Sequence, residues 1–556
     1  MASVSPAAPR PVAVAEAPVN DGGREPQWLR DPAEAVTAEA LRRRLTGPLA
    51  SWRDYPPSLR LWYWLTPVLT AVIGGILRFV RLGDPHSLVF DETYYVKDAY
   101  SYLISGYERN WPDKANDAFN AGDPSVILST PEYVVHPPVG KWMIAFGMAL
   151  FGPTNTFGWR FSAALTGTLS ILLVALIAQK MLGSVTLGGV AGLLTAVEGH
   201  HLVMSRTSLL DIFLMFWVLA AFGALLLDRD DGRRRLAARV SRAAGAPGAL
   251  LSGPWLWFRP WRLAAGVCLG LAVGTKWSGL FFLAGFGLLT VFWDLGARRA
   301  AGIRHWAGGG VLKDGLPAFL SIVPTTAVVY LLTWTGWFLS SNAYDRHWAE
   351  SNPSAAWGWI PNSLRSLWHY HLSAYNFHTG LSADHPYKAN AWTWLVMGRP
   401  TSFYYESPKP GQDSCTFSGC TEAILSVGNP VIWWSAAAAL VVLLFWWVGR
   451  RDWRAGAILA AVAAGYLPWF LYPQRTTFFF YAIAFEPFLV LALVFCLGLV
   501  LGRPADPPGR RQAGVLVVGL FVVAALVCAA FFLPIWTAEP ITYNEWRLRM
   551  WMPSWI

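Results

Sequence analysis

Apolar residues follow one another in long runs along this chain, and short polar segments separate the runs. A run of about 20 apolar residues matches the hydrocarbon core of a bilayer when it folds as a helix. The pattern therefore predicts a polytopic membrane protein with about eleven transmembrane helices. The predicted spans are residues 62–80, 160–181, 185–204, 209–227, 262–278, 279–295, 316–338, 430–448, 455–472, 477–501 and 513–535.

The polar segments between the runs predict how the spans are oriented. Basic segments follow the fourth, sixth, eighth and tenth spans, and "DRDDGRRRLAARVSR" is the longest of them. All four fall on one side, which the positive-inside rule makes cytoplasmic. The N-terminus is then inside, the C-terminus is outside, and two long loops, 81–159 and 339–429, face outward. Within the first loop, residues 141–152 are too few to span comfortably, and we expect a helix lying in the outer interface.

Composition supports a membrane protein. The chain is 54% hydrophobic and 14% charged, which excludes an ordinary soluble globular protein of 556 residues. Its 32 Trp fit residues at membrane interfaces. The net charge of +10 lies in the short loops, so nucleic acid is not an indicated partner. Residues 1–58 lack the features of a signal peptide and are predicted to be a disordered cytoplasmic tail, with a binding arm as the alternative.

Two of the five cysteines lie close together in the second outward loop. Cys415 and Cys420 stand in "DSCTFSGCTEA", where Gly and Ser allow a tight turn. An oxidising exterior favours a disulfide between them, and two free thiols are the alternative. The other three, Cys268, Cys496 and Cys528, lie in apolar spans and are expected to pack there.

An acid pair opens the first outward loop. Asp91 and Glu92 begin "DETYYVKDAYSYL", about ten residues beyond the first span, and the spacing after them predicts a short interfacial helix. One hypothesis is that the pair only caps this helix, because the helix dipole favours carboxylates at an N-terminus. The other is that one of the two is a general base held at the rim of the bilayer.

Cationic residues in other outward segments favour the second hypothesis. Each alone anchors a helix end in many membrane proteins. Together they form a ring on one rim, which suits the phosphate of a lipid whose tail lies in the bilayer. The candidates are His136, Lys141, Arg160, Arg206, Lys276 and Arg475, and the segment "EGHHLVMSRTSLLD" adds Glu198, His200, His201 and Asp211.

Nothing in the pattern indicates a nucleotide or a metal. There is no P-loop and no GxGxxG after a strand. The aromatic second loop holds five histidines, but none is spaced with carboxylates as a tight ligand set, so we expect no metal and no other cofactor. These histidines are His347, His369, His371, His378 and His385. A sugar donor carried on a lipid fits better than a nucleotide sugar.

Four stretches in order, "FDE", "HPPVGKW", "SRTSLLD" and "HPYKANAWTW", resemble the membrane glycosyltransferases of the GT-C type. They are most similar to the bacterial, actinobacterial-type protein O-mannosyltransferases, and the resemblance covers about residues 60–556. It implies an all-α N-terminal transmembrane module (59–338) and a C-terminal four-helix module (430–556). The second loop (339–429) is too short for the β-trefoil MIR domain of eukaryotic members.

The resemblance implies that mannose passes from polyprenyl phosphomannose to Ser or Thr hydroxyls of proteins being exported, on the outer face of the cell membrane. The secretion machinery is then a candidate partner. In the family the first acid of the pair is the base, which corresponds to Asp91, and Glu92 supports the site. Arg160 corresponds to a position associated with the lipid phosphate. Weaker carry-overs are His136, Arg206, Asp211 and Arg475, with Lys141, Lys276, Glu198 and His385 as further candidates.

Two other functions stay open at this point. A GT-C enzyme that moves another lipid-linked sugar, such as arabinose, would use the same cations. A polyprenyl-lipid transporter without enzymatic activity would more often show internal repeats and midplane charges, and neither is evident. The oligomeric state and the natural acceptor proteins are not predicted.

Overall fold

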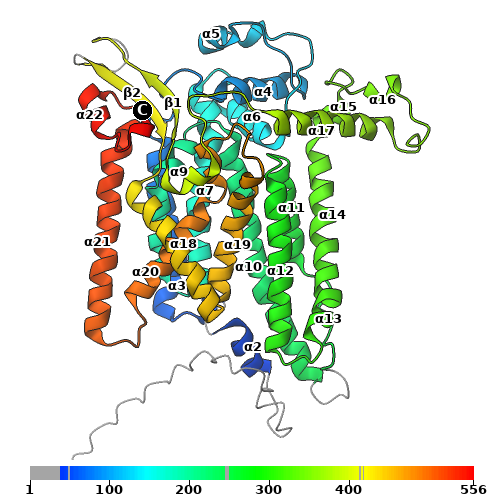
Figure 1. Cartoon of the computed structure of the whole chain (residues 1–556), viewed down its shortest axis with the longest axis vertical. Coiled ribbons are helices and arrows are strands. Elements are labelled where there is room, and N and C mark those ends of the chain that lie inside the picture. Colours follow the sequence, from blue (N-terminus) through cyan, green and yellow to red (C-terminus); the bar gives the residue numbers. More distant parts are fainter. Residues whose placement is uncertain (1–37, 48–50, 244–249, 412–414, 417–418) are drawn as a thin grey trace, which may run out of the picture.

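The computed structural model describes residues 38–47, 51–243, 250–411, 415–416 and 419–556. Within them the chain forms a bundle of long helices with short helices and a small sheet gathered at one end (Figure 1). Buried apolar side chains run through the middle of the bundle, as a helical membrane protein requires.

Eight helical segments of the described chain are long and apolar enough to cross a bilayer. Each corresponds to one of the predicted spans, which confirms a polytopic helical membrane protein. Helix α13 (Trp306–Gly310) leads into the fifth, and a 3₁₀ turn extends the seventh to Leu471. The helices are α3 (Pro57–Phe79), α7 (Thr156–Leu182), α10 (Leu210–Ala243), α12 (Gly279–Ala300), α14 (Leu316–Thr333), α18 (Pro430–Arg450), α19 (Trp453–Tyr466) and α21 (Pro508–Phe532).

The count of eleven spans is not confirmed, because the three remaining predicted spans are shorter helices. They are α8 (Val185–Ala196), α11 (Pro260–Val273) and α20 (Glu486–Leu501). The predicted span 185–204 stops early because Glu198 starts a separate helix, α9 (Gly199–Met204). The backbone N–H of His201 donates to the Glu198 carboxylate at 2.7 Å. This cap turns the chain out of the line of α8.

The first outward loop folds into α4 (Glu92–Ser105), α5 (Ala115–Asn120) and α6 (Val139–Phe151). Helix α4 begins at the acid pair, which confirms the predicted helix. Helix α6 has 13 residues and packs against α4 and α7. The predicted helix at 141–152 is therefore confirmed, and its depth in the bilayer stays a prediction.

The fold is mostly helical as predicted, but the second outward loop and the C-terminus add a small sheet that was not predicted. Besides α15 (Thr335–Leu339), α16 (Trp348–Ser351) and α17 (Asn362–Gly380), three antiparallel strands form a sheet in the order β1-β2-β3. Strand β1 (Thr401–Glu406) pairs with β2 (Cys420–Ser426), and β2 pairs with β3 (Ile541–Thr542), which leads into α22 (Tyr543–Leu548). The segment "TSFYYE" has the β-branched and aromatic residues that favour strands.

The predicted disulfide is confirmed. Cys415 and Cys420 are bonded, with their Cα atoms 6.0 Å apart, at the start of β2. Cys268, Cys496 and Cys528 are free, as expected for residues of the apolar spans.

Part of the predicted disordered tail is ordered. Residues 1–37 lie outside the described residues, but Ala38–Thr46 form helix α2. Its Leu41 and Leu45 are each 2% exposed and pack on Leu236 and Val240 of α10, which supplies the stabilisation that the tail's composition does not indicate.

The two ends of the bundle carry different parts of the chain. Helix α2 lies at one end, and α4, α6, α17 and the C-terminus lie at the other (Figure 1). That these two ends face opposite sides of the membrane stays a prediction.

Candidate active site

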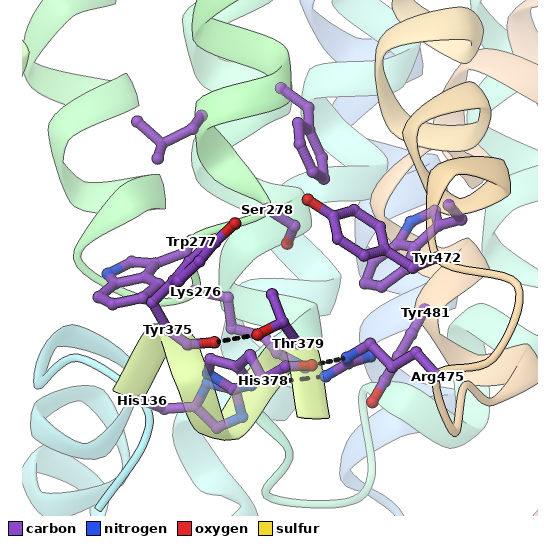
Figure 2. Close-up of a pocket in the computed structure, with 13 residues that line it drawn as sticks. His136, Lys276, Trp277, Ser278, Tyr375, His378, Thr379, Tyr472, Arg475 and Tyr481 are labelled. Carbon is purple, nitrogen blue, oxygen red and sulfur yellow. Dashed lines mark hydrogen bonds between the residues drawn. The ribbon is translucent and has the colours of Figure 1, made fainter. Parts of the chain in front are cut away.

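A cavity of about 190 Å³ lies at the end of the bundle that carries α4, α6 and α17. Cationic and aromatic side chains from four separate segments surround it (Figure 2). His136 comes from the first outward loop, and Lys276 from the break between α11 and α12. The other lining residues are Trp277, Ser278, Leu280, Phe281, Tyr375, His378, Thr379, Trp469, Tyr472, Arg475 and Tyr481.

Lys276 is fixed in the wall of this cavity by an ion pair. Its ammonium donates to both carboxylate oxygens of Asp211, at 2.9 and 3.0 Å, and lies 4.6 Å from the ring centroid of Tyr481. Lys276 is 8% exposed and Asp211 2%. Asp211 stands in the first turn of α10, so the pair joins α10 to the α11–α12 break. The predicted site residues Lys276 and Asp211 are therefore brought together.

The α11–α12 break is held at a defined distance from the first outward loop. Gly274 O accepts a hydrogen bond from the backbone N–H of Val139 at 2.9 Å. A Cβ at Gly274 would come within 2.9 Å of side-chain atoms of both Thr333 and Val139. Only glycine permits this approach, which sets Lys276 beside the segment that carries His136.

Asp91 lies next to the Lys276–Asp211 pair, and its carboxylate has no partner of its own. It precedes α4, and its carboxylate makes no hydrogen bond or ion pair with any other described residue. Burial raises the pKa of the Asp91 carboxyl to about 7. The Lys276 ammonium acts against this shift, and the Asp211 carboxylate adds to it. A half-buried carboxylate with a pKa near neutrality is suited to take up a proton.

The Glu92 carboxylate, in contrast, is bound on both oxygens by groups of the protein. It forms a bidentate pair with Arg160, with Nε and Nη2 both 2.9 Å from its carboxylate oxygens, and both side chains are fully buried. The backbone N–H of Ser208 also donates to Glu92, at 2.9 Å. This clasp fixes the first turn of α4 on α7, and it thereby positions the neighbouring Asp91.

The expectation that Arg160 faces a lipid phosphate is therefore wrong. Its remaining donors are used by backbone carbonyls of the first loop, at Leu82, Pro85 and Ser87. An arginine at the outer end of a span has the sequence position of a phosphate ligand. Here the partner of that arginine is the buried Glu92 carboxylate and not a phosphate.

Two further predicted cations, Arg206 and Lys141, do not line the cavity. Arg206 donates to the last carbonyls of α3, including Arg78 O at 3.0 Å and Val80 O at 2.7 Å, and so caps that helix. Lys141 is fully buried, bonded to Glu108 and, at 2.9 Å, to the backbone oxygen of His136. The expectation of a direct phosphate contact is wrong for both, although Lys141 does fix the segment that bears His136.

Arg475 does face the cavity. Its Nε donates to His378 O at 2.9 Å, and its guanidinium lies 5.5 Å from the Trp469 ring and 5.8 Å from the Tyr481 ring (Figure 2). Among the described residues it has no carboxylate partner within ion-pair distance, so its charge is uncompensated. Lys276 and Arg475 are thus the two predicted cations that line the cavity.

Two neutral histidines complete the polar wall. The rings of His136 and His378 lie 5.1 Å apart, and Figure 2 shows them close together. Burial lowers the pKa of His136 well below its usual value, with a further contribution from Lys276, and burial lowers the pKa of His378 to about 4. Both rings are neutral near pH 7, and a neutral ring has one donor and one acceptor. In His378 both are engaged, since Nε2 donates to Val135 O at 2.9 Å and Nδ1 accepts from Arg475 at 3.5 Å.

Glu198 and His385, the other predicted residues, do not line the cavity. Glu198 caps α9 and accepts a hydrogen bond from Asn429 N at 2.8 Å. The His200 ring bonds to the Ser426 hydroxyl, and the His201 ring bonds to the Arg78 guanidinium. The His385 ring lies 4.9 Å from Phe478, in an aromatic group around Phe90. In the described part of the chain no three His, Cys, Asp or Glu side chains are grouped so as to hold a metal ion.

Phe90 holds the backbone immediately before Asp91. It has a φ of 46°, a left-handed conformation that bulky residues rarely adopt. Its ring stacks on Phe403 of β1 at 4.8 Å and meets Phe480 at 5.6 Å. Aromatic packing thus offsets a backbone strain of about 1–3 kcal/mol next to the candidate base.

Sequence reasoning did not single out most of the aromatic lining. Tyr375 and His378 come from α17, and Trp469, Tyr472 and Tyr481 come from the segment around Arg475. Tyr375 and His378 are three residues apart, and this spacing places both on one face of a helix. The spacing could therefore have predicted that they face the same site.

Family models match both halves of the chain. The model described as dolichyl-phosphate-mannose-protein mannosyltransferase matches residues 68–307, and the C-terminal four TMM region of protein-O-mannosyltransferase matches residues 363–555.

Curated relatives match over nearly the full length. The polyprenol-phosphate-mannose–protein mannosyltransferase of Mycobacterium tuberculosis is 37% identical over 92% of this chain and 95% of its own. That of Mycolicibacterium smegmatis is 38% identical over 92% and 96%, and that of Corynebacterium glutamicum 33% over 88% and 93%. An undecaprenyl phosphate-aminoarabinose transferase of Pseudomonas fluorescens matches only 35% of this chain, at 30% identity.

The fold is also that of a solved structure. The S. cerevisiae protein O-mannosyltransferase Pmt1–Pmt2 complex bound to the sugar donor matches with a TM-score of 0.66, covering 89% of this chain and 92% of that one. The sequence identity is 16%, so this likeness concerns the fold alone.

Proposed function

Because the chain belongs to the protein O-mannosyltransferase family, we propose that it transfers mannose from polyprenyl phosphomannose to Ser or Thr hydroxyls of proteins. The observation that carries the mechanism is Asp91. It is a carboxylate with no hydrogen-bonding partner among the described side chains and with a pKa of about 7, beside a cavity lined by Lys276 and Arg475. It has the environment of a general base, and the two cations have the environment of phosphate ligands.

The shape of the cavity supports a donor with a lipid tail. A second cavity of about 500 Å³ shares Trp277, Leu280 and Tyr375 with the first. A third, also about 500 Å³, shares Leu280, Leu283 and Val323 with the second. Together they lead from the cations into an almost wholly apolar groove between α12 and α14. A phosphate held at Lys276 and Arg475 would leave its isoprenoid chain in this groove, within the bilayer.

The proposed reaction is a single displacement. Asp91 takes the proton of the acceptor hydroxyl while the hydroxyl oxygen forms a bond to the anomeric carbon of mannose. The bond between that carbon and the phosphate oxygen breaks, and the oxygen keeps the electron pair as polyprenyl phosphate. Lys276 and Arg475 stabilise the negative charge that develops on the phosphate.

We place the cavity on the outer face of the cell membrane. The basic segments that follow α10, α12, α18 and α20 support this orientation, because the positive-inside rule assigns them to the cytoplasm. Helix α17, which lines the cavity, lies at the end of the bundle opposite α2, the end that also carries the C-terminus (Figure 1). Acceptors would then be proteins that are being exported, and the secretion machinery is a candidate neighbour.

Reconstituted enzyme tests the proposal directly. Proteoliposomes receive labelled polyprenyl phosphomannose and a Ser/Thr-rich peptide, and a peptide with Ala at every Ser and Thr is the matched control. Label is expected in the first peptide only. Label transferred to a lipid or glycan but not to the peptide, or transfer from a polyprenyl-linked arabinose donor in preference to mannose, would contradict the proposal.

A further inference from the structure

A separate cavity lies at the opposite end of the bundle from the candidate active site. It measures about 530 Å³ and is lined by the end of α2, the end of α7, the middle of α10, the turn between α18 and α19, and the segment after α20. Helix α2 places it at the lower end in Figure 1. The residues that face it have no part in the reaction proposed above.

Six cationic side chains and two carboxylates line this cavity. The carboxylates are already occupied. Asp230 accepts from Lys180 at 2.6 Å and from Arg229 at 2.9 Å, and Asp452 accepts from Arg454 at 2.6 Å. The cavity therefore keeps an excess of positive charge after its internal ion pairs are formed.

The excess charge sits on Arg450, Arg451 and Arg503. Within the described residues, none of these three guanidinium groups makes a hydrogen bond or an ion pair with the protein. Arg450 lies against the ring of Trp446, at 4.9 Å. Three arginines that face one cavity without a protein partner are a favourable arrangement for an external anion with several oxygens.

Arg229 gives an independent indication. It is 5% exposed, it lines the cavity, and its Nε has no hydrogen-bond partner in the structure. Its guanidinium lies 3.5 Å from the ring centroid of Trp453. A buried guanidinium donor without an acceptor costs free energy, so a ligand oxygen at this place would be stabilising.

The remaining lining residues are apolar side chains and tryptophans, the combination found at a membrane interface. Met181, Leu182 and Leu226 provide apolar surface next to the cations, and Trp446 and Trp453 are of the type that concentrates at headgroup depth. We infer that this cavity binds the phosphate headgroup of an anionic lipid in the leaflet opposite the candidate active site. The arginines bind the phosphate oxygens, and the apolar surface receives the first carbons of the chains.

The test is lipid retention by the purified full-length protein, measured by native mass spectrometry. Phosphatidylglycerol is the anionic probe, phosphatidylcholine the zwitterionic one, and inorganic phosphate the soluble one. The test variant carries Arg450→Gln, Arg451→Gln and Arg503→Gln. A matched control carries Arg242→Gln, Arg299→Gln and Arg304→Gln, which removes the same charge from exposed residues that do not line the cavity.

We expect the wild type and the control to prefer phosphatidylglycerol. In the test variant its dissociation constant should rise by about tenfold or more for each phosphate contact that is lost. Each single Arg→Gln variant is measured as well, with its melting temperature, so that a folding defect in the triple variant does not hide the result.

Three results would overturn the inference. Unchanged retention in the test variant would mean that the arginines do not hold the lipid. Equal losses in the test and control variants would mean a general charge effect. Binding of inorganic phosphate at lower concentrations than phosphatidylglycerol would assign the cavity to a soluble anion.

Discussion

Replacing Asp91 by Asn provides the sharpest test of the proposed mechanism. The substitution keeps the size of the side chain and removes its basicity. The Asp91 carboxylate makes no hydrogen bond to another described residue, so its loss leaves no new unsatisfied partner in the protein. General-base catalysis contributes about 100- to 10,000-fold, and transfer should fall by at least the lower factor. Donor affinity should persist, because Lys276 and Arg475 still line the cavity.

The pH dependence of the wild type gives the same test without a mutation. The base must be ionised to accept a proton, and the Asp91 carboxyl has a pKa of about 7. About a tenth of it is then ionised at pH 6 and about nine tenths at pH 8, so the transfer rate should rise roughly tenfold over this interval. Burial keeps His136 and His378 neutral throughout it, since the pKa of each is lowered, in His378 to about 4.

The assay is the initial rate of mannose transfer at saturating donor, from pH 5.5 to 8.5. Asp117→Asn is the matched control, because Asp117 is exposed on α5 in the same loop. This control should keep both the wild-type rate and its pH profile. A flat profile in the wild type, or near-normal transfer by a folded Asp91→Asn protein, would refute the assignment of Asp91 as the base.

Three other predictions follow from the contacts described above. Arg160→Lys should lower the melting temperature, because losing part of the buried pair with Glu92 costs up to about 3–5 kcal/mol, and unchanged melting would contradict the clasp. Arg475→Ala should weaken donor binding by about 10- to 100-fold, as measured by titration with the donor lipid, while melting stays near that of the wild type. Maleimide labelling of intact cells should reach Ser554→Cys but not a cysteine placed at Arg235, and equal access to both would contradict the orientation.

Eight of the eleven spans and the start of α4 at Asp91 and Glu92 could be predicted because they are properties of short stretches of sequence. The three shorter helices show that an apolar run alone does not decide how far a helix continues. Lys276 and Arg475 both line the cavity, and each stands at an outer span end in a polar stretch that the apolar runs do not require, while their contact with a phosphate stays a prediction.

The partners of buried charges could not be predicted in the same way. Glu92 and Arg160 are 68 residues apart, and nothing local distinguishes an arginine that meets a carboxylate from one that awaits a phosphate. The sheet escaped prediction for a similar reason. Strand β2 pairs both with β1 and with two residues near the C-terminus, Ile541 and Thr542, so its partners are not visible in its own segment.

The aromatic group around Phe90 has a consequence for the order in which the enzyme is made. Asp91 emerges early in synthesis, but the rings of Phe403 and Phe480, which hold the strained residue before it, emerge hundreds of residues later. The carboxylate is therefore present long before its backbone is fixed. A nascent chain that has inserted only its first half carries the proposed base without the conformation that aims it. Synthesis of the last third of the chain thus completes the proposed site.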